Sequence, residues 1–363
     1  MNLITPTVRV LVVDDSAFIR YTLTKHLEAD PAISVVGTAR DGLEALAKIP
    51  ALRPDVVTMD VEMPGMDGLA TLQRVMKECP TPVIMLSSLT QRGARTTIQA
   101  LMRGAVDFVP KPTASTDLRE VIEELIAKIK AAAGVRPMPT SSSVAEAAPT
   151  TEYGTLAPRA EVRGGLNPFR IGDPLVIIGS STGGPRALQQ VVPNLPGDLP
   201  AAVVVVQHMP AGFTAPLAQR LNEASALTVQ EAADGDRLAR GLVLLAPGDY
   251  HLRFQGGKQV VLDQGPRVNH VRPSVDVTIE SAVAFHGAAV IGVILTGMGS
   301  DGAAGARLIK QAGGRVIVED ESTAVVYGMP RSVAEAGLAD MSVPLPEVAA
   351  VVTQMVNDGT TRV

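Results

Sequence analysis

An apolar run that ends in two aspartates lies near the start of the chain: VRVLVVDDS, residues 8–16. Similar short runs recur further along, and amphipathic stretches with helical spacing separate them. The further runs are ISVVGTA (33–39), VVTMD (56–60), PVIMLS (82–87) and AVDFVPK (105–111). Buried strands that alternate with helices are typical of a parallel, doubly wound sheet. A last helix is predicted over residues 117–133, where apolar residues again recur at helical spacing.

A second alternating block begins at Pro174. Its runs are LVIIG (175–179), AAVVVVQH (201–208), LVLLAPG (242–248), AVIGVILTG (289–297) and RVIVED (315–320). Such continuous Val, Ile and Leu content favours parallel strands that are covered on both faces. Residues 134–170 are instead rich in Pro, Gly and Ser, which is typical of a linker. The sequence therefore predicts two doubly wound, mainly parallel α/β domains, 1–133 and 171–363, joined by a linker over 134–170.

Charge and composition exclude several classes of protein. The 363 residues carry a net charge of −5, and residues 171–363 hold 13 basic and 18 acidic side chains. A nucleic-acid module usually shows a basic surface, so no nucleic-acid partner is expected. The single cysteine, Cys79, excludes an intramolecular disulfide. No signal-peptide pattern or spanning segment is visible, so we expect a soluble, cytoplasmic protein without direct membrane insertion.

Chemically active side chains close four of the predicted strands in the first block. They are Asp14 and Asp15, Asp60, Ser87 and Lys111. Ligands of doubly wound folds bind at the carboxyl ends of the strands, so these side chains are expected in one crevice. Oxygen ligands of this kind suit Mg²⁺, and a carboxylate beside Mg²⁺ can accept a phosphoryl group. An isolated aspartate pair more often forms a turn or a helix cap. The other chemically active residues at the ends of neighbouring strands favour a functional site instead.

The first block resembles the receiver domain of two-component response regulators. The resemblance rests on VVDDS (12–16), MDVEMPGMDG (59–68), Ser87 and AVDFVPKP (105–112). It implies that Asp60 is phosphorylated by a chemotaxis histidine kinase. It also implies that Asp14, Asp15 and Asp60 hold Mg²⁺, while Ser87 and Lys111 contact the phosphoryl group.

A serine in a glycine-rich turn follows the first strand of the second block. Gly179-x-Ser181-x-Gly183 lies between the run LVIIG and a helix-like stretch, RALQQVV. This arrangement fits a nucleophile on a sharp turn, with N–H groups at the helix start available to an oxyanion. The motif alone is weak, because a small-residue turn before a helix needs no catalytic role.

Two more candidates follow other strands of this block. His208 closes the run AAVVVVQ, and Asp301 lies in the turn after VIGVILTGMGS. A neutral imidazole can accept the serine proton, and a carboxylate can fix its tautomer. His270 is a rival base, and Asp249 and Asp276 are rival carboxylates, each with a local structural explanation.

The second block resembles the catalytic domain of the chemotaxis protein-glutamate methylesterases. The shared motifs are GSSTGGP (179–185), QHMPAGFT (207–214), APGDYH (246–251), RPSVD (272–276), ILTGMGSDGA (294–303) and VYGMPR (326–331). The resemblance implies Ser181 as nucleophile, His208 as base and Asp301 as its carboxylate, with Thr182 and Met298 lining the site. Ser180 departs from the family, in which many members carry alanine there, so the turn contains two adjacent serines; the match to S-T-G-G favours Ser181 as the nucleophile.

The two resemblances together imply a phosphorylation-activated serine hydrolase. Its substrates would be glutamyl methyl esters and glutamines of methyl-accepting chemotaxis receptors. Mg²⁺ would serve receiver phosphorylation, and no cofactor would serve the esterase reaction. The alternative from another class is a response regulator whose output domain binds receptors without catalysis.

Overall fold

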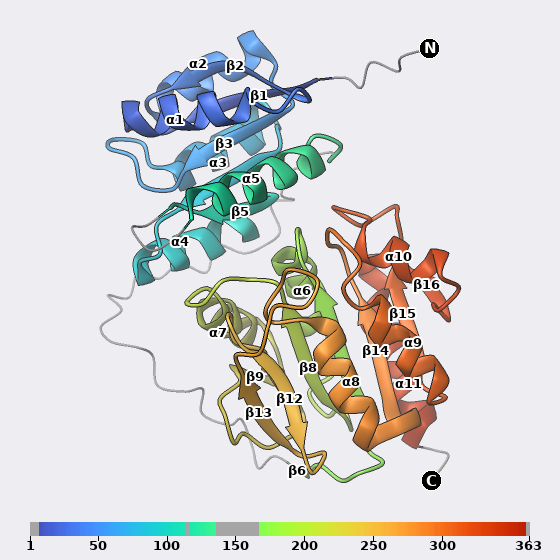
Figure 1. Cartoon of the computed structure of the whole chain (residues 1–363). Coiled ribbons are helices and arrows are strands. Elements are labelled where there is room, and N and C mark those ends of the chain that lie inside the picture. Colours follow the sequence, from blue (N-terminus) through green and yellow to red (C-terminus); the bar gives the residue numbers. More distant parts are fainter. Residues whose placement is uncertain (1–6, 113–116, 136–166, 361–363) are drawn as a thin grey trace, which may run out of the picture. The chain divides into compact units, whose positions relative to one another are not determined.

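The chain folds into two compact units. The computed structural model describes residues 7–112, 117–135 and 167–360 (Figure 1). Clustering of contacts divides the units between Pro149 and Thr150. That point, like most of the predicted linker, lies outside the described residues, and each unit is described by itself. The domain boundaries at 133 and 170 stay predictions.

The first unit contains a five-stranded parallel sheet in the order β2-β1-β3-β4-β5. The strands are β1 (Val8–Val13), β2 (Ile33–Ala39), β3 (Val56–Asp60), β4 (Val83–Ser87) and β5 (Asp107–Pro110). Each lies within one of the five apolar runs, which confirms the predicted strands. Four side chains of β1, from Val10 to Val13, are fully buried, as expected for a strand covered on both faces.

Five helices complete the first unit. They are α1 (Ala17–Leu27), α2 (Gly42–Leu52), α3 (Gly68–Glu78), α4 (Gln91–Met102) and α5 (Leu118–Ala132). Helix α1 packs against α5, whereas α2, α3 and α4 pack in a row. Two separate groups of helices are what a doubly wound sheet requires, one for each face.

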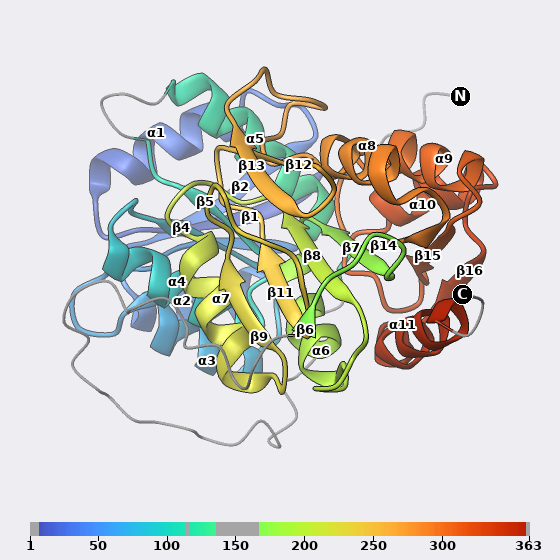
Figure 2. The same cartoon turned by 90° about the horizontal axis from the view of Figure 1, so that it is seen from below.

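The second unit contains a seven-stranded sheet in the order β16-β15-β14-β7-β8-β11-β9, and all of its neighbouring strands are parallel. The strands are β7 (Leu175–Ser180), β8 (Ala202–Gln207), β9 (Thr228–Glu231), β11 (Leu242–Leu245), β14 (Val290–Ile294), β15 (Arg315–Glu319) and β16 (Met341–Val343). Figure 2 shows them in this order, from yellow β9 to red β16. The doubly wound fold class predicted from the sequence is therefore confirmed for both units.

Helices cover this sheet as well. They are α6 (Gly184–Val191), α7 (Thr214–Ala224), α8 (Val275–His286), α9 (Ala303–Gln311), α10 (Met329–Glu335) and α11 (Leu345–Thr360), with short 3₁₀ turns at Val192–Asn194 and Gly287–Ala289. Helix α8 packs against α9 and β7. No helix of the described residues is long and apolar enough to cross a membrane.

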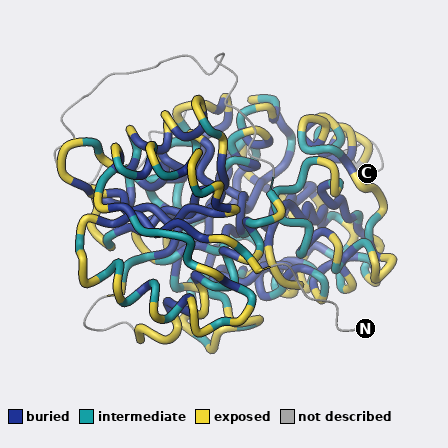
Figure 3. The backbone as a smooth tube through the Cα atoms, turned by 90° about the horizontal axis from the view of Figure 1, so that it is seen from above, coloured by how far each residue is buried: buried dark blue, intermediate teal, exposed yellow. Residues whose placement is uncertain are grey.

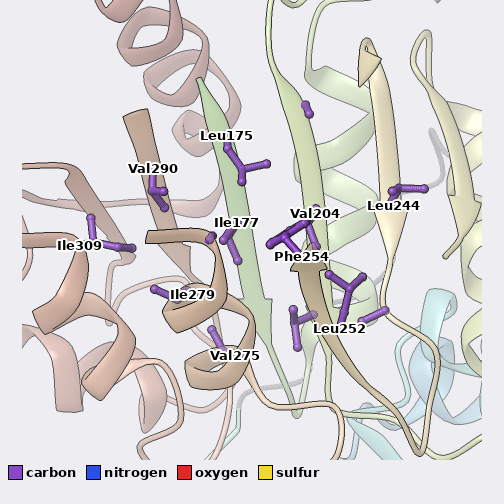
Figure 4. Packing of buried hydrophobic residues seen from close by; sticks show 14 of the residues in the cluster. Leu175, Ile177, Val204, Leu244, Leu252, Phe254, Val275, Ile279, Val290 and Ile309 are labelled. Carbon is purple, nitrogen blue, oxygen red and sulfur yellow. The ribbon is translucent and has the colours of Figure 1, made fainter. Parts of the chain in front are cut away.

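A continuous apolar core lies between the sheet and helix α8. Leu175 and Ile177 of β7 lie beside Val204 of β8, and Val275 and Ile279 of α8 cover them (Figure 4). Each of these five side chains has no exposed surface. Figure 3 shows the general pattern, in which buried segments, dark blue, are flanked by exposed turns in yellow.

Short antiparallel pairs, which the sequence did not predict, are added to the second unit. Strands β12 (His251–Gln255) and β13 (Gln259–Asp263) form a hairpin, and β6 (Asn167–Pro168) pairs with β10 (Ala239–Arg240). Strand β6 falls inside the predicted linker, and Phe169 next to it is 4% exposed. Residues at the end of the predicted linker therefore pack against the second unit, because the Phe169 side chain is buried in its core.

The strand order creates a switch point at β7. Its parallel neighbours are β8, which follows it in the chain, and β14, which comes much later. Connections leave a switch point in opposite directions, so a crevice opens at the carboxyl ends of the strands. Ser181 follows β7, His208 follows β8 and Asp301 follows β14.

Candidate functional site

The first unit gathers three carboxylates at the carboxyl ends of its strands. Asp14 and Asp15 follow β1, and Asp60 ends β3. One oxygen of each lies within 4.8 Å of the others. We call these three residues the carboxylate cluster. Asp14 and Asp60 are buried, whereas Asp15 is exposed.

Lys111 supplies the positive charge that faces this cluster. Its Nζ lies 2.8 Å from Asp14 Oδ2 and 2.8 Å from Asp60 Oδ2. Burial raises the pKa of Asp60, and the negative charge of Asp14 acts in the same direction, although Lys111 opposes both. Three carboxylates against one ammonium leave an excess of negative charge, and oxygen ligands match a hard divalent cation. The residues present therefore fit such an ion.

Ser87 reaches the same edge from the neighbouring strand. It follows Leu86, which pairs with Asp60 in the sheet register. The Ser87 side chain is fully buried, and its Oγ accepts a 2.7 Å hydrogen bond from Thr97 Oγ1 on helix α4. The structure thus brings together the strand ends on which the sequence analysis placed a phosphoryl site.

In the second unit, the two adjacent serines have different environments. Ser180 has no exposed surface, and its Oγ donates a 2.6 Å hydrogen bond to Gln207 Oε1. Ser181 is partly exposed and lies at the turn into α6. Gln207 Nε2 in turn donates to the Ser181 carbonyl oxygen at 2.9 Å. The geometry favours Ser181 over Ser180 as the accessible nucleophile.

Glycines make this turn sterically feasible. Gly183 has a φ of 78°, which favours glycine over other residues. A Cβ on Gly184 would lie 2.0 Å from Gln207 Oε1, and a Cβ on Gly297 would lie 2.8 Å from Ser181 Cβ. The backbone around Ser181 is therefore closely packed on two sides.

His208 and Asp301 form a direct pair across the switch point. His208 Nε2 lies 2.7 Å from Asp301 Oδ2, and both side chains are largely buried. Since Nε2 is engaged with the carboxylate, Nδ1 is the nitrogen left to accept a proton. No hydrogen bond joins Ser181 Oγ to His208 within the described chain.

Several donors surround Asp301, and the sequence analysis had not recognised them. They are Ser274 Oγ at 2.8 Å, Val275 N at 2.6 Å, Asp276 N at 3.2 Å and Asn269 Nδ2 at 3.1 Å. Burial alone would raise the pKa of Asp301, but the hydrogen bonds and charge of His208, with these donors, lower it below its usual range. Asp301 is thereby held as a carboxylate. The motif RPSVD, which contains Ser274 and Val275, was the only sequence signal for them.

The rival residues occupy other positions. His270 lies at an exposed turn with a φ of 66°. Asp249 pairs with Arg272, whose Nη2 lies 2.6 Å from Asp249 Oδ1. Asp276 Oδ1 accepts hydrogen bonds from the N–H groups of Gly302 and Gly305, at the start of α9. None of the three takes part in the His208–Asp301 pair.

Asp276 nevertheless lies close to the pair. Burial, with the negative charge of Asp301 acting in the same direction, raises its pKa to about 6. Asn269 Nδ2 bridges the two carboxylates, at 3.0 Å from Asp276 Oδ2 and 3.1 Å from Asp301 Oδ1. This amide reduces the repulsion between two neighbouring acidic groups.

Thr182 and Met298 both lie close to the turn that contains Ser181. Thr182 is 2% exposed and follows Ser181 directly. Met298 is 40% exposed and follows Gly297, the residue packed against Ser181. The Ser181 N–H donates to Thr296 O at 3.0 Å, so an oxyanion would need other N–H groups of the turn. The prediction concerned N–H groups at the start of α6, where the Gly184 N–H donates to Ser181 O at 2.8 Å and Pro185 has no N–H.

Taken together, fold and site define a response-regulator receiver joined to an α/β domain with a hydrolase-like serine, histidine and aspartate. The receiver family model matches residues 10–123, and the CheB methylesterase model matches residues 176–352. A protein-glutamate methylesterase/protein-glutamine glutaminase of Symbiobacterium thermophilum is 52% identical, over 97% of this chain and 98% of its own length. Its counterpart from Thermotoga maritima is 48% identical over 93% and 95%. The chain belongs to this family of protein-glutamate methylesterases/protein-glutamine glutaminases.

The catalytic domain of Thermotoga maritima CheB methylesterase is 50% identical, with a TM-score of 0.49, and the match covers 50% of this chain and 98% of that domain.

Proposed function

We propose that the chain is a phosphorylation-activated serine hydrolase of chemotactic adaptation. It cleaves glutamyl methyl esters on methyl-accepting chemotaxis receptors and deamidates receptor glutamines. The observation that carries this proposal is the position of Ser181, His208 and Asp301 after the neighbouring strands β7, β8 and β14, with His208 and Asp301 in contact, in a chain whose relatives are named for this activity. We further propose that residues 1–133 are the receiver, 134–170 the linker and 171–363 the catalytic domain.

Ester cleavage follows from the roles of the three side chains. Ser181 Oγ attacks the ester carbonyl carbon while His208 Nδ1 accepts its proton. Asp301 holds the ring through Nε2 and stabilises the imidazolium. The carbon–oxygen bond to the methoxy group then breaks, and His208 returns the proton so that methanol leaves. Water repeats the sequence on the glutamyl ester of Ser181, and no metal or other cofactor takes part in this reaction.

Deamidation uses the same attack on a receptor glutamine, with ammonia as the leaving group. Thr182 and Met298 flank the reacting serine and would shape the entry of the receptor side chain. The partly exposed Met298 offers an apolar surface, whereas buried Thr182 fixes the turn.

The receiver would control this activity through Asp60. A chemotaxis histidine kinase is the proposed phosphodonor, and Asp60 the acceptor. Asp14, Asp15 and Asp60 would hold Mg²⁺, which neutralises charge on the phosphoryl group when it is bound. Lys111 and Ser87 would contact the phosphoryl oxygens, and Ser87 Oγ would then donate to one of them instead of to the Ser88 carbonyl oxygen, to which it now donates at 3.2 Å. With receptor helices as substrate and the kinase as phosphodonor, the protein would act in the cytoplasm.

The test is methanol release from methylated receptor membranes by the full-length protein. Ser181→Ala should abolish release and labelling by a fluorophosphonate, whereas Ser180→Ala, the matched neighbour, should still be labelled. Asp60→Ala should no longer respond to acetyl phosphate with Mg²⁺. Methanol release by Ser181→Ala at the unmutated rate would refute the proposed nucleophile.

A further inference from the structure

Thr296 holds the nucleophile turn by two hydrogen bonds. It lies just after β14 and has no exposed surface. Its carbonyl oxygen accepts from Ser181 N at 3.0 Å. Its hydroxyl donates to the carbonyl oxygen of Thr182 at 2.9 Å. The backbone on both sides of the Ser181 side chain is thus fixed by one residue of a neighbouring strand end.

The other polar atoms of Thr296 are also engaged. Its Oγ1 accepts from Val326 N at 2.9 Å. Its own N–H donates to Glu319 Oε2 at 2.7 Å. A buried polar network restrains its members most strongly when every donor and acceptor has a partner, as at this residue.

Glu319 ends β15 and is completely buried. Its second oxygen, Oε1, accepts from Thr323 Oγ1 at 3.1 Å. Among the residues that the structure describes, no Lys, Arg or His forms an ion pair with it. The neighbouring charge is Asp320, which has the same sign and itself binds Ser322 and Ser342. Burial of a carboxyl group without a cation is costly, so its retention here calls for a specific role.

We propose that Thr296 and Glu319 are positioning residues that set the location of Ser181 Oγ without touching the substrate. Thr296 acts on the Ser181–Thr182 backbone directly, and Glu319 acts by fixing the N–H of Thr296. The proposal rests on Ser181 being the nucleophile, as proposed above. The residues that determine the activity would then include, besides the three catalytic side chains, two positioning residues at the ends of β14 and β15.

The test compares Thr296→Val with Thr296→Ser in the full-length protein. Valine keeps the shape but removes the hydroxyl, whereas serine keeps the hydroxyl. Thr228→Val is the matched control, because Thr228 is 2% exposed and begins the edge strand β9, whereas the serine turn follows the carboxyl end of β7. The measurements are the rate constant of fluorophosphonate labelling, kcat and KM for methanol release, and Tm.

Thr296→Val should lower kcat and the labelling rate roughly tenfold to a hundredfold with KM little changed, because small misplacement of a reacting atom has effects of this size. Thr296→Ser should recover most of that loss. Thr228→Val should leave both rates within about twofold whatever its effect on Tm, since it alters packing and not the turn. Equal effects of the two valine variants on labelling would overturn the proposal.

Glu319→Leu provides an independent test of the proposal if Thr296→Val does not fold. It removes the acceptor for Thr296 N–H and should slow labelling, whereas Glu319→Gln keeps a carbonyl oxygen and should lose less. Labelling at the unmutated rate by Glu319→Leu would refute the role of Glu319. Failure of the underlying function is distinguishable, because then Ser181→Ala would still be labelled or the unmutated protein would not be labelled at all.

Discussion

The buried carboxyl of Glu319 should make the stability of the second unit depend on pH. Burial raises its pKa from 4.5 to about 7, against the hydrogen bonds from Thr296 and Thr323. Between these two values the folded state keeps a proton that the unfolded state has lost. The stabilisation is therefore complete below about pH 4.5 and lost as the pH rises through about 7. Because one pKa unit corresponds to about 1.4 kcal/mol, the total change is about 3 kcal/mol.

Glu319→Gln removes this dependence, since an amide does not titrate. The variant should gain about 3 kcal/mol in free energy of unfolding, relative to the unmutated protein, between pH 4.5 and pH 8. The assay is urea denaturation of the full chain from pH 4.5 to 8, with unfolding of the second unit followed by pulsed hydrogen exchange in peptides of β14 and β15. Glu335→Gln, an exposed glutamate in the same unit, is the matched control. A constant difference between Glu319→Gln and the unmutated protein at every pH would refute the reasoning.

Three further outcomes are expected. In EDTA, Lys111→Met should reduce the free energy of unfolding of the first unit by about 2 to 4 kcal/mol, because the carboxylate cluster loses the lysine ammonium. Millimolar Mg²⁺ should restore part of this stability. Equal losses in both buffers, measured by calorimetry, would contradict the prediction. Gly297→Ala should slow fluorophosphonate labelling, because the new Cβ would lie 2.8 Å from Ser181 Cβ; labelling at the unmutated rate would argue against that close packing. Burial alone would raise the pKa of Asp173, but the Arg240 guanidinium lowers it. Arg240→Ala should therefore reduce the free energy of unfolding by about 1 kcal/mol at neutral pH, and by less below about pH 4. A reduction that does not depend on pH in urea titrations would exclude this charge effect.

The parallel strands were the most predictable part of the fold. Continuous runs such as AAVVVVQH, residues 201–208, are unusual in any other setting than a strand buried on both faces. The β12–β13 hairpin was missed because its burial is mixed and its strands carry Arg253 and Asp263, which pair with each other at 2.7 Å. Strand pairs of this kind depend on contacts between side chains that form only in the folded protein, so a hydrophobic pattern does not predict them.

Only part of the site could be predicted from the sequence. Strand-end position and family resemblance pointed to Ser181, His208 and Asp301, whose catalytic roles stay predictions. The residues that support them could not be found in this way. Thr296 and Glu319 carry no motif of their own, and their importance arises from hydrogen bonds to segments more than 20 residues away. Only the folded chain shows which backbone group each side chain meets.

The crowded environment of Asp301 has a consequence for the history of this enzyme. Its two oxygens accept from an imidazole, an amide, a hydroxyl and two backbone N–H groups at once. Replacement by asparagine would turn one acceptor into a donor that faces donors, although the shape would be nearly unchanged. No single exchange at any one partner repairs that mismatch. Several separate segments thus require a carboxylate at this position, and a lineage that loses it can restore the hydrogen bonds only by restoring the aspartate itself.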